Sequence, residues 1–372
     1  MRIGFIKRKY VPFGGGENYL ERLMRACRAA GHDVHLVTTA WPRDRVADVA
    51  VHPVRVDALG RGGRMRVFSR RAALAVRDAG LDLSFSLERT AQQDVWRAGE
   101  GVHRVWLQRR RRWQPAWRAA LDGMTPRHRA MLALEAAAAC NSPLVIANSR
   151  MVQRDLEQTY PERRGRIRVI YNGVDDARFS VLARNADRRR VRAALRLPPR
   201  RGLLLFVGSG FRRKGLHEAL AALTHLPDCE LLVFGRDRLT RWRDRVRRLD
   251  LRDRVRFMPP TSDLAPYYHA ADVVVLPSWF DPFPSAGLEA LRCGTPLVSS
   301  RFAGVHELID LDVNGDIVDT PAHIAELTGA IHRQLDLSRT HTGRADAIAA
   351  SVSAYTMQRN VEETLAAIQS RH

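Results

Sequence analysis

The sequence predicts an α/β protein with two doubly wound, Rossmann-like domains that face a cleft. Two series of short apolar segments alternate with segments of helical pattern, and a polar, arginine-rich stretch at residues 176–201 separates the two series. Strands without a polar face are typical of parallel sheets that helices cover on both sides. A length of 372 residues is long for a single core and suits two domains.

The apolar segments give the expected elements in chain order. The first series predicts strands at 2–10, 33–40, 49–56, 81–87, 144–149 and 166–175, with a helix at 17–30. The second series predicts strands at 202–209, 229–236, 254–260, 272–278 and 295–300. A last helix is expected at 353–368, packing back toward the first domain. The expected domains are therefore 1–170 and 171–352, followed by a C-terminal helical segment at 353–372.

The composition indicates a soluble protein of a reducing compartment. No apolar run approaches the roughly 18–20 residues that span a membrane, and the first residues lack the apolar region of a signal peptide. The four cysteines lie far apart with no paired spacing, so we expect neither disulfides nor a zinc site. These features predict a cytoplasmic protein.

The net charge of +21 comes almost wholly from arginine. A bias toward arginine codons is one explanation, and an anionic partner is another. The segment 103–118 interleaves cations with tryptophans, and the expected surface patch comprises Trp106, Arg109, Arg110, Arg111, Arg112 and Trp113. Tryptophan with arginine suits an anionic membrane surface, where indoles lie at the interface and guanidinium groups bind phosphates. The same residue types suit single-stranded nucleic acid, so charge alone leaves both open.

Three glycine-rich turns fall where strands end and helices begin, the edge at which doubly wound sheets bind ligands. The first, PFGGGENY, has neither the dinucleotide-binding spacing nor a P-loop. The second, FVGSGFRRKGL, puts three cations before a helix, where they oppose the helix dipole unless an anion is bound. We expect an anion site at this second turn.

The third turn, FDPFPSAGLEALRCGTP, carries Asp281 and Glu289 on either side of a helix start. The first N–H groups of that helix can bind a pyrophosphate. Glu289 can then accept hydrogen bonds from ribose, and Asp281 can reach a sugar on the far phosphate. An acid in a first helical turn also contributes about 0.3–1 kcal/mol to helix stability, which would explain Glu289 but not Asp281.

The stretch FDPFPSAGLEALRCGTPLVSS resembles the signature of the retaining, nucleotide-sugar-dependent glycosyltransferases of family 4, which have the GT-B fold. The resemblance covers most of the chain, through GGGE, GHDVHLVTT, IANSRMVQRDL, IRVIYNGVD, VRFMPP and YYHAADVVVLPS. Within the family, DVWRAGEGVHRVW and GSGFRRKGL are most similar to segments of the enzymes that glucosylate heptose in the lipopolysaccharide core. The resemblance implies transfer of a hexose, glucose, from a UDP-sugar to a lipopolysaccharide-core or other cell-surface glycan. It also implies peripheral association with the cytoplasmic membrane face and no metal or other cofactor.

The resemblance assigns roles to individual residues. The expected donor-binding residues are Gly15, Gly16, Ser209, Arg212, Lys214, Ser285, Ala286, Gly287, Leu288 and Glu289. Lys214 matches the family lysine on the pyrophosphate, whereas Ser209 replaces a family arginine whose charge Arg212 is expected to supply. The expected catalytic residues are Glu17, Glu100, His103 and Asp281. Either Glu100 or His103 is expected near the anomeric carbon, and Asp281 is one methylene shorter than the family glutamate.

Two other function classes remain open at this point. A nucleic-acid-binding protein would explain the charge, but the sequence has no zinc-finger spacing or RNP-like aromatic motif, so no nucleic acid is expected. A non-catalytic sugar-nucleotide-binding protein would fit if Asp281 is a degenerate acid. The one Asp-x-Asp pair, Asp310 and Asp312, lies in a polar stretch that predicts a surface loop, and no metal site is expected.

Overall fold

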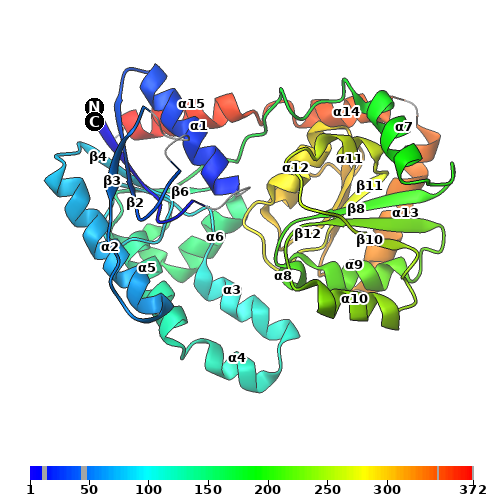
Figure 1. Cartoon of the computed structure of the whole chain (residues 1–372), viewed down its shortest axis with the longest axis horizontal. Helices are drawn as coiled ribbons and strands as arrows, with labels where there is room; N and C mark the ends of the chain where they lie inside the picture. The colour runs from blue at the N-terminus through cyan, green and yellow to red at the C-terminus, as the bar shows by residue number, and fades with distance from the viewer. Residues whose placement is uncertain (11–14, 43–47, 342, 371–372) are drawn as a thin grey trace. The chain divides into compact units, whose positions relative to one another are not determined.

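The chain forms two compact α/β units in a computed structural model, which describes residues 1–10, 15–42, 48–341 and 343–370. The first unit comprises Met1–Tyr171 and Asn360–His372, and the second comprises Asn172–Arg359. The sequence predicts domain boundaries between residues 170 and 171 and between residues 352 and 353. In the structure, the chain passes from one unit to the other between residues 171 and 172 and between residues 359 and 360. In each unit, helices flank a parallel sheet (Figure 1).

The first unit has a seven-stranded sheet in the order β3-β2-β1-β4-β5-β6-β7. Its strands are β1 (Arg2–Ile6), β2 (Asp33–Thr38), β3 (Ala50–Pro53), β4 (Leu83–Ser86), β5 (Val95–Arg97), β6 (Leu144–Ala147) and β7 (Ile167–Val169). Its helices are α1 (Gly15–Ala29), α2 (Gly60–Asp78), α3 (His103–Arg110), α4 (Ala116–Asp122), α5 (Pro126–Asn141), α6 (Arg150–Thr159) and most of α15 (Met357–Gln369). All the paired strands are parallel, as the apolar segments predict.

The second unit has a six-stranded parallel sheet in the order β10-β9-β8-β11-β12-β13. Its strands are β8 (Gly202–Val207), β9 (Cys229–Phe234), β10 (Val255–Phe257), β11 (Val273–Leu276), β12 (Leu297–Ser300) and β13 (Gly315–Val318). Its helices are α7 (Arg184–Ala194), α8 (Phe211–Lys214), α9 (Leu216–Leu223), α10 (Leu239–Arg248), α11 (Ala265–Ala270), α12 (Ser285–Arg292), α13 (Ile324–Thr340) and α14 (Arg344–Ser351). Every residue of β8 and β9 is buried, which is why these strands show no polar face in the sequence.

Two strands are absent from the sequence-based prediction. β5 has three residues and β13 has four, and both include a charged residue, so neither stands out as an apolar run. Asp310 and Asp312 lie in the turn before β13, where Asp312 N–H donates to Asp310 Oδ1 at 3.1 Å. The predicted loop around these two acids is therefore confirmed.

The order of strands reverses at one place in each sheet. In the first unit this switch point lies between β1 and β4, and in the second it lies between β8 and β11. Loops that leave a sheet in opposite directions at a switch point open a crevice outside the carboxyl ends of the strands. Ligand-binding residues are therefore expected in the segments that follow β1, β4, β8 and β11.

Glycines allow backbone segments to approach one another closely at the switch point of the second unit. Gly215 has φ +86°, and a Cβ atom there would lie 2.0 Å from the backbone oxygen of Pro277, just after β11. Gly235 has φ +144°, and its Cβ would lie 2.2 Å from the backbone oxygen of Gly208. The loops after β8, β9 and β11 are thus packed backbone to backbone.

We expect Gly215→Ala to destabilise the chain more than Gly343→Ala. Both glycines have left-handed φ values, +86° and +79°, which cost an L-residue about 1–2 kcal/mol. A Cβ at Gly215 would also clash with backbone atoms, whereas nothing lies within 4 Å of a Cβ at Gly343. This overpacking should add about 1–3 kcal/mol to the loss of unfolding free energy in Gly215→Ala, measured by urea unfolding. Equal losses in the two variants would contradict the close approach.

Candidate functional site

A buried ion pair lies at the switch point of the second unit. Lys214 ends α8, after β8, and Asp281 follows β11, so neighbouring strands bring the two side chains together. Lys214 Nζ lies 2.7 Å from Asp281 Oδ2, and both side chains are at most one-tenth exposed. The sequence places both residues in the donor site, and the structure makes them direct partners.

The side chain of Lys214 is buried. A lysine that bound only a ligand phosphate would face solvent, whereas Lys214 is 8% exposed and paired with Asp281. Its side chain runs across Gly208, because a Cβ on Gly208 would lie 2.6 Å from Lys214 Cδ. Lys214 is therefore held in place before any ligand arrives, and the pair with Asp281 is part of the fold.

The second cation at this site is Arg213 and not Arg212. Arg212 forms an ion pair with the buried Glu218. Its positive charge, which the sequence assigns to the pyrophosphate, is therefore neutralised by Glu218. Arg213 Nη1 instead lies 3.3 Å from Asp281 Oδ2 and donates to the backbone oxygen of Phe280 at 2.7 Å. Three consecutive cations give no sequence signal that separates their roles.

Asp281 is ionised in this setting. Burial alone would raise its pKa, but Lys214 and Arg213 together lower the pKa below its ordinary value. Its backbone is fixed as well, since Asp281 N–H donates to Phe302 O at 2.9 Å and its carbonyl accepts from Gly304 N–H at 2.9 Å. The carboxylate is a rigid anion between two cations.

Helix α12 begins immediately after this pair. Its N-cap residue is Pro284, which offers no side-chain hydrogen bond to the first amides. Ser285 is half-buried and Ala286, Gly287 and Leu288 are buried. A Cβ on Gly287 would lie 2.9 Å from Leu297 Cδ2, so this glycine seats α12 against β12. Gly287 N–H donates to Pro284 O at 2.9 Å, so an anion at this helix start would meet the amides of Ser285 and Ala286.

Glu289 lies in the second turn of α12 and is oriented by Tyr268. The buried Tyr268 hydroxyl donates to Glu289 Oε2 at 2.8 Å. Burial raises the pKa of Glu289, and the Tyr268 hydrogen bond partly opposes that rise. The sequence gives no sign of this role for Tyr268. Ser209, at the position of the family arginine, accepts a hydrogen bond from Arg236 N–H at 3.1 Å.

The switch point of the first unit also carries charged residues. Lys7, just after β1, lies 3.7 Å from Glu17 Oε1 of α1 and 3.4 Å from Glu88 Oε1 after β4. Burial raises the pKa of Glu17, against the attraction of Lys7. Gly15 and Gly16 begin α1, whereas Pro12–Gly14 of the same glycine-rich turn lie outside the described residues. Of the four predicted catalytic residues, Glu17 and Asp281 are therefore both paired with a lysine.

Glu100 and His103 lie in different surroundings. Glu100 is 58% exposed at its side chain and pairs with the buried Arg89, which also binds Glu135 at 3.1 Å. The protein atoms around the Glu100 carboxyl oppose its ionisation, but Arg89 and Lys7 outweigh them and lower its pKa. Glu100 is therefore an accessible, ionised carboxylate.

His103 is 4% exposed and stacks on His128, with its Nε2 2.9 Å from His128 Nδ1. Burial, followed by the charge of Arg89 and by His128, lowers the pKa of His103 to about 3. A histidine with this pKa is neutral near pH 7 and is a weak base. Between the two alternatives that the sequence leaves open, the structure favours Glu100 for contact with a ligand.

A cavity of about 750 Å³ opens beside Glu100 in the first unit. This volume lies within the range of about 300–1,000 Å³ that is typical of small-molecule sites. Its wall includes Arg89 and Glu100 together with residues that follow β1, β2 and β3. The cavity therefore lies at the carboxyl edge of the sheet, where a ligand is expected.

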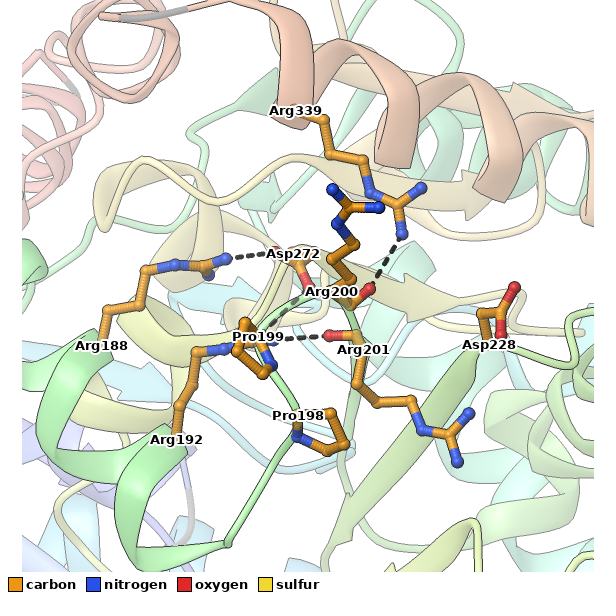
Figure 2. Close-up of a pocket in the computed structure, with 9 residues that line it drawn as sticks. All are labelled: Arg188, Arg192, Pro198, Pro199, Arg200, Arg201, Asp228, Asp272 and Arg339. Atoms are coloured by element: carbon orange, nitrogen blue, oxygen red, sulfur yellow. Dashed lines mark hydrogen bonds and ion pairs between the residues drawn. The ribbon is translucent and has the colours of Figure 1, made fainter.

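A second cavity, of about 630 Å³, lies at the amino edge of the sheet in the second unit (Figure 2). Asp272, just before β11, binds Arg188 and Arg192 of α7, and it accepts a hydrogen bond from Leu203 N–H at 2.7 Å. Arg339 of α13 donates to the Arg200 carbonyl at 3.3 Å. Arg188 and Arg192 fasten α7 to the segment before β11, and Arg339 ties α13 to the segment before β8. We therefore assign this cavity a structural role.

The predicted arginine–tryptophan patch is partly a structural element. Arg109 pairs with Asp155 at 3.5 Å and Arg110 with Asp122 at 3.5 Å. Trp106 and Trp113 are half-buried and pack on each other, with ring centroids 5.4 Å apart. Of the expected patch, only Arg111 and Arg112 are exposed. The exposed aromatic residue is Trp117, which is 62% exposed on α4 near Leu121 (52%) and Met124 (68%).

No group of three or more His, Cys, Asp or Glu side chains that could hold a metal ion occurs within residues 1–10, 15–42, 48–341 and 343–370. Among the helices of these same ranges, none combines the length and the apolar character of a membrane span.

Lys214→Met should destabilise the folded chain, because it leaves the buried Asp281 carboxylate with only half-buried Arg213 beside it. Removal of one partner from a buried ion pair costs about 3–5 kcal/mol, and Arg213 should keep the loss near the lower value. Urea unfolding at pH 7 measures it. The double variant Lys214→Met/Asp281→Asn should regain part of the loss. A loss under about 0.5 kcal/mol in Lys214→Met, typical of surface substitutions, would contradict this account.

The Lys214–Asp281 pair also predicts how the stability of the fold depends on pH. Because the folded-state pKa of Asp281 is lowered, the stability it contributes is present above its unfolded pKa of 3.8 and is lost as the pH falls through the folded value. The stability difference between wild type and Lys214→Met should therefore shrink below about pH 4. A difference that stays constant down to the acid unfolding of the wild type would contradict the ionised pair.

Two family matches divide the chain. Residues 13–178 match Glycosyltransferase Family 4, and residues 187–349 match Glycosyl transferases group 1. The D-inositol 3-phosphate glycosyltransferase of Xylanimonas cellulosilytica is 35% identical over 202 residues, which cover 51% of this chain and 48% of that protein. The glycogen synthase of Mycobacterium tuberculosis is 28% identical over 380 residues, with 90% and 86% covered. The chain thus spans about half the length of the first of these relatives.

Solved structures resemble the whole chain. WaaG, a glycosyltransferase involved in lipopolysaccharide biosynthesis, superposes with a TM-score of 0.84 at 21% identity and covers 97% of this chain and 98% of its own. Anabaena Alr3699/HepE in complex with UDP-glucose gives a TM-score of 0.76 at 21% identity, with both chains fully covered. At these identities the likeness establishes the fold, which is GT-B. With this fold and with the matches in both of its units, the chain belongs to the family 4 glycosyltransferases.

Proposed function

We propose that the chain is a retaining, metal-independent hexosyltransferase. Its donor is UDP-glucose, and its acceptor is a lipopolysaccharide-core glycan or another cell-surface glycan at the cytoplasmic face of the membrane. The observation that carries the proposal is the convergence of Lys214, Arg213 and the first turn of α12 at the switch point of the second sheet. Anabaena Alr3699/HepE, which shares the fold, has been solved with UDP-glucose.

The donor site combines two cations with the backbone amides that begin α12. When the bond from the anomeric carbon to the diphosphate breaks, negative charge builds on the leaving phosphate. Lys214, Arg213 and the α12 amides are fixed before that charge develops, which is the arrangement that stabilises a transition state most effectively. Glu289, with Oε2 held by Tyr268, directs a carboxylate at the ribose hydroxyls.

The state of Asp281 argues against a double displacement at this residue. A double displacement needs a carboxylate that attacks the anomeric carbon. Asp281 is bound on Oδ2 by both cations, and its lowered pKa makes it a weak nucleophile. We therefore propose front-face attack. The acceptor hydroxyl oxygen forms the new glycosidic bond as the anomeric C–O bond breaks, and the hydroxyl proton passes to the departing phosphate oxygen.

Transfer of labelled glucose from UDP-glucose to a lipopolysaccharide-core acceptor tests this function. The product should keep the anomeric configuration of the donor by NMR, and the rate should survive a chelator. Inversion would contradict front-face attack, and loss of activity with the chelator would contradict metal independence. Absence of both UDP-glucose binding and transfer would overturn the proposed donor.

Glu289→Gln should weaken the binding of UDP itself, because it removes the carboxylate that accepts from ribose. Loss of a hydrogen bond to a charged group costs about 1.5–3 kcal/mol, or roughly ten- to a hundredfold in Kd by calorimetry. Tyr268→Phe should weaken UDP binding less, since it removes only the group that orients Glu289. Unchanged UDP affinity in Glu289→Gln would remove Glu289 from the donor site.

The membrane-facing surface of the proposed enzyme is α4 with its flanking residues. Trp117, Leu121 and Met124 expose apolar side chains beside the exposed Arg111 and Arg112. Apolar groups of this kind insert at the headgroup boundary, while each basic residue adds about 1 kcal/mol on an anionic surface.

The triple variant Trp117→Ser/Leu121→Ser/Met124→Ser should reduce binding to vesicles that contain anionic lipid. The matched control is Leu59→Ser/Leu182→Ser/Leu311→Ser, which replaces three exposed apolar side chains elsewhere. The control should bind vesicles as wild type does. Equal losses in both triple variants would show that α4 has no special part in membrane binding.

A further inference from the structure

The cavity beside Glu100 is lined almost entirely by positive charge. Seven cations and two acids line it, and Arg89 among the cations is satisfied by Glu100 and Glu135. The other cations, here named the six-cation cluster, are Arg8, Lys9, Arg55, Arg61, Arg64 and Arg127. In the parts of the chain that the structure describes, no member of this cluster forms an ion pair with a carboxylate. The second lining acid, Asp57, pairs with Arg71 outside the cavity at 3.1 Å.

The fold brings the six-cation cluster together from separate segments. Arg8 and Lys9 follow β1, and Arg55 follows β3. Arg61 and Arg64 lie at the start of α2, and Arg127 lies in the first turn of α5. Helices α2 and α5 pack side by side (Figure 1). They touch near their starts, since a Cβ on Gly62 would lie 2.5 Å from the backbone oxygen of Pro126.

Stability does not explain this arrangement. Two like charges 4 Å apart repel by about 1 kcal/mol even in bulk water. The first turns of α2 and α5 contain no acid, so their cations also oppose the positive ends of the helices. The cluster raises the free energy of the empty protein. A bound anion reverses that cost, and a cavity lined by one sign of charge also concentrates anions.

The rest of the wall fits a sugar ring. Val54, Val56, Met65 and Met131 supply apolar surface, and Glu100 supplies an ionised acceptor for a hydroxyl. Together with the cations they describe a ligand that is part carbohydrate and part anion. A phosphate monoester carries about −1.5 to −2 charges at pH 7, so six cations match at least two phosphates.

We infer that this cavity binds the acceptor glycan and selects one that carries at least two phosphate groups next to the accepting sugar. The inference rests on the proposed function for the identity of the reaction, and it adds the acceptor class. Arginine forms bidentate hydrogen bonds with phosphate oxygens, and four of the six cations are arginines on α2, on α5 and after β3.

Calorimetry on the full chain, saturated with UDP, tests the cavity directly. The probes are fructose 1,6-bisphosphate, fructose 6-phosphate and fructose, at about 150 mM salt, where charges beyond roughly 8 Å are screened. The bisphosphate should bind at least about tenfold more tightly than the monophosphate, and fructose should not bind measurably. Equal affinity for the three probes would overturn the inference.

A matched pair of variants separates the cavity from the general basicity of the chain. Arg61→Gln/Arg64→Gln/Arg127→Gln removes half of the six-cation cluster and should weaken bisphosphate binding about tenfold or more. Arg66→Gln/Arg70→Gln/Arg77→Gln removes the same charge from exposed positions of α2 that do not line the cavity, and should leave bisphosphate binding within about twofold. Equal losses in both variants would show attraction by overall charge and would overturn the inference.

Transfer assays complete the test. A lipopolysaccharide-core acceptor stripped of its phosphates should show a raised KM and a nearly unchanged kcat relative to the untreated acceptor. The UDP affinity of the variant Arg61→Gln/Arg64→Gln/Arg127→Gln should equal that of wild type. If wild type binds no UDP-glucose, the proposed function fails. If it binds UDP-glucose and transfers glucose equally well to both acceptors, the proposed function holds and the phosphate selectivity is wrong.

Discussion

A parallel sheet gathers the carboxyl ends of all its strands at one edge, and both units place their charged residues at that edge where the strand order reverses. In the first unit, Lys7 follows β1 and Glu88 follows β4. In the second, Lys214 comes after β8 and Asp281 after β11. Residues that lie about 70 to 80 positions apart in the sequence become neighbours because the strands before them are paired. The chemistry of both units depends on this pairing.

Each edge also contains buried charge that is held by the fold. Lys214 and Arg213 surround Asp281 in one unit, and Arg89 bridges Glu100 and Glu135 in the other. Buried ion pairs of this kind contribute little net stability compared with apolar packing, although loss of one partner is expensive. These ion pairs instead hold the charged side chains in fixed positions. Lys214 lies against Gly208 before a diphosphate arrives, and Arg89 orients an exposed Glu100 toward the cavity.

The fold class and the parallel sheets could be predicted from the sequence, because buried strands leave local patterns. The glycine-rich turns also mark the strand ends at which Lys214 and Asp281 meet. The partners of individual side chains could not be predicted. Nothing in the run Arg212–Lys214 indicates that the first cation turns to Glu218 while the other two turn to Asp281. Tyr268 lies 21 residues before Glu289, within YYHAADVVVLPS, and nothing in that stretch indicates a contact with Glu289. β13 is too short and polar to register as a strand.

The expected membrane patch shows the same limit. The sequence locates the segment correctly as rich in arginine and tryptophan, but burial decides which residues are exposed. Trp106 and Trp113 pack on each other, whereas Trp117 is exposed. The six-cation cluster is a case in which no local pattern exists, because its members come from four separate segments that meet only in the folded chain.

The most direct test of the central claim is a crystal structure of the chain with bound UDP-glucose. The account predicts diphosphate oxygens within about 2.7–2.9 Å of Lys214 Nζ, contacts to the first amides of α12, and ribose hydroxyls on the Glu289 carboxylate. A nucleotide bound instead at the amino edge of the second sheet, among Arg188, Arg192 and Arg339, would contradict it.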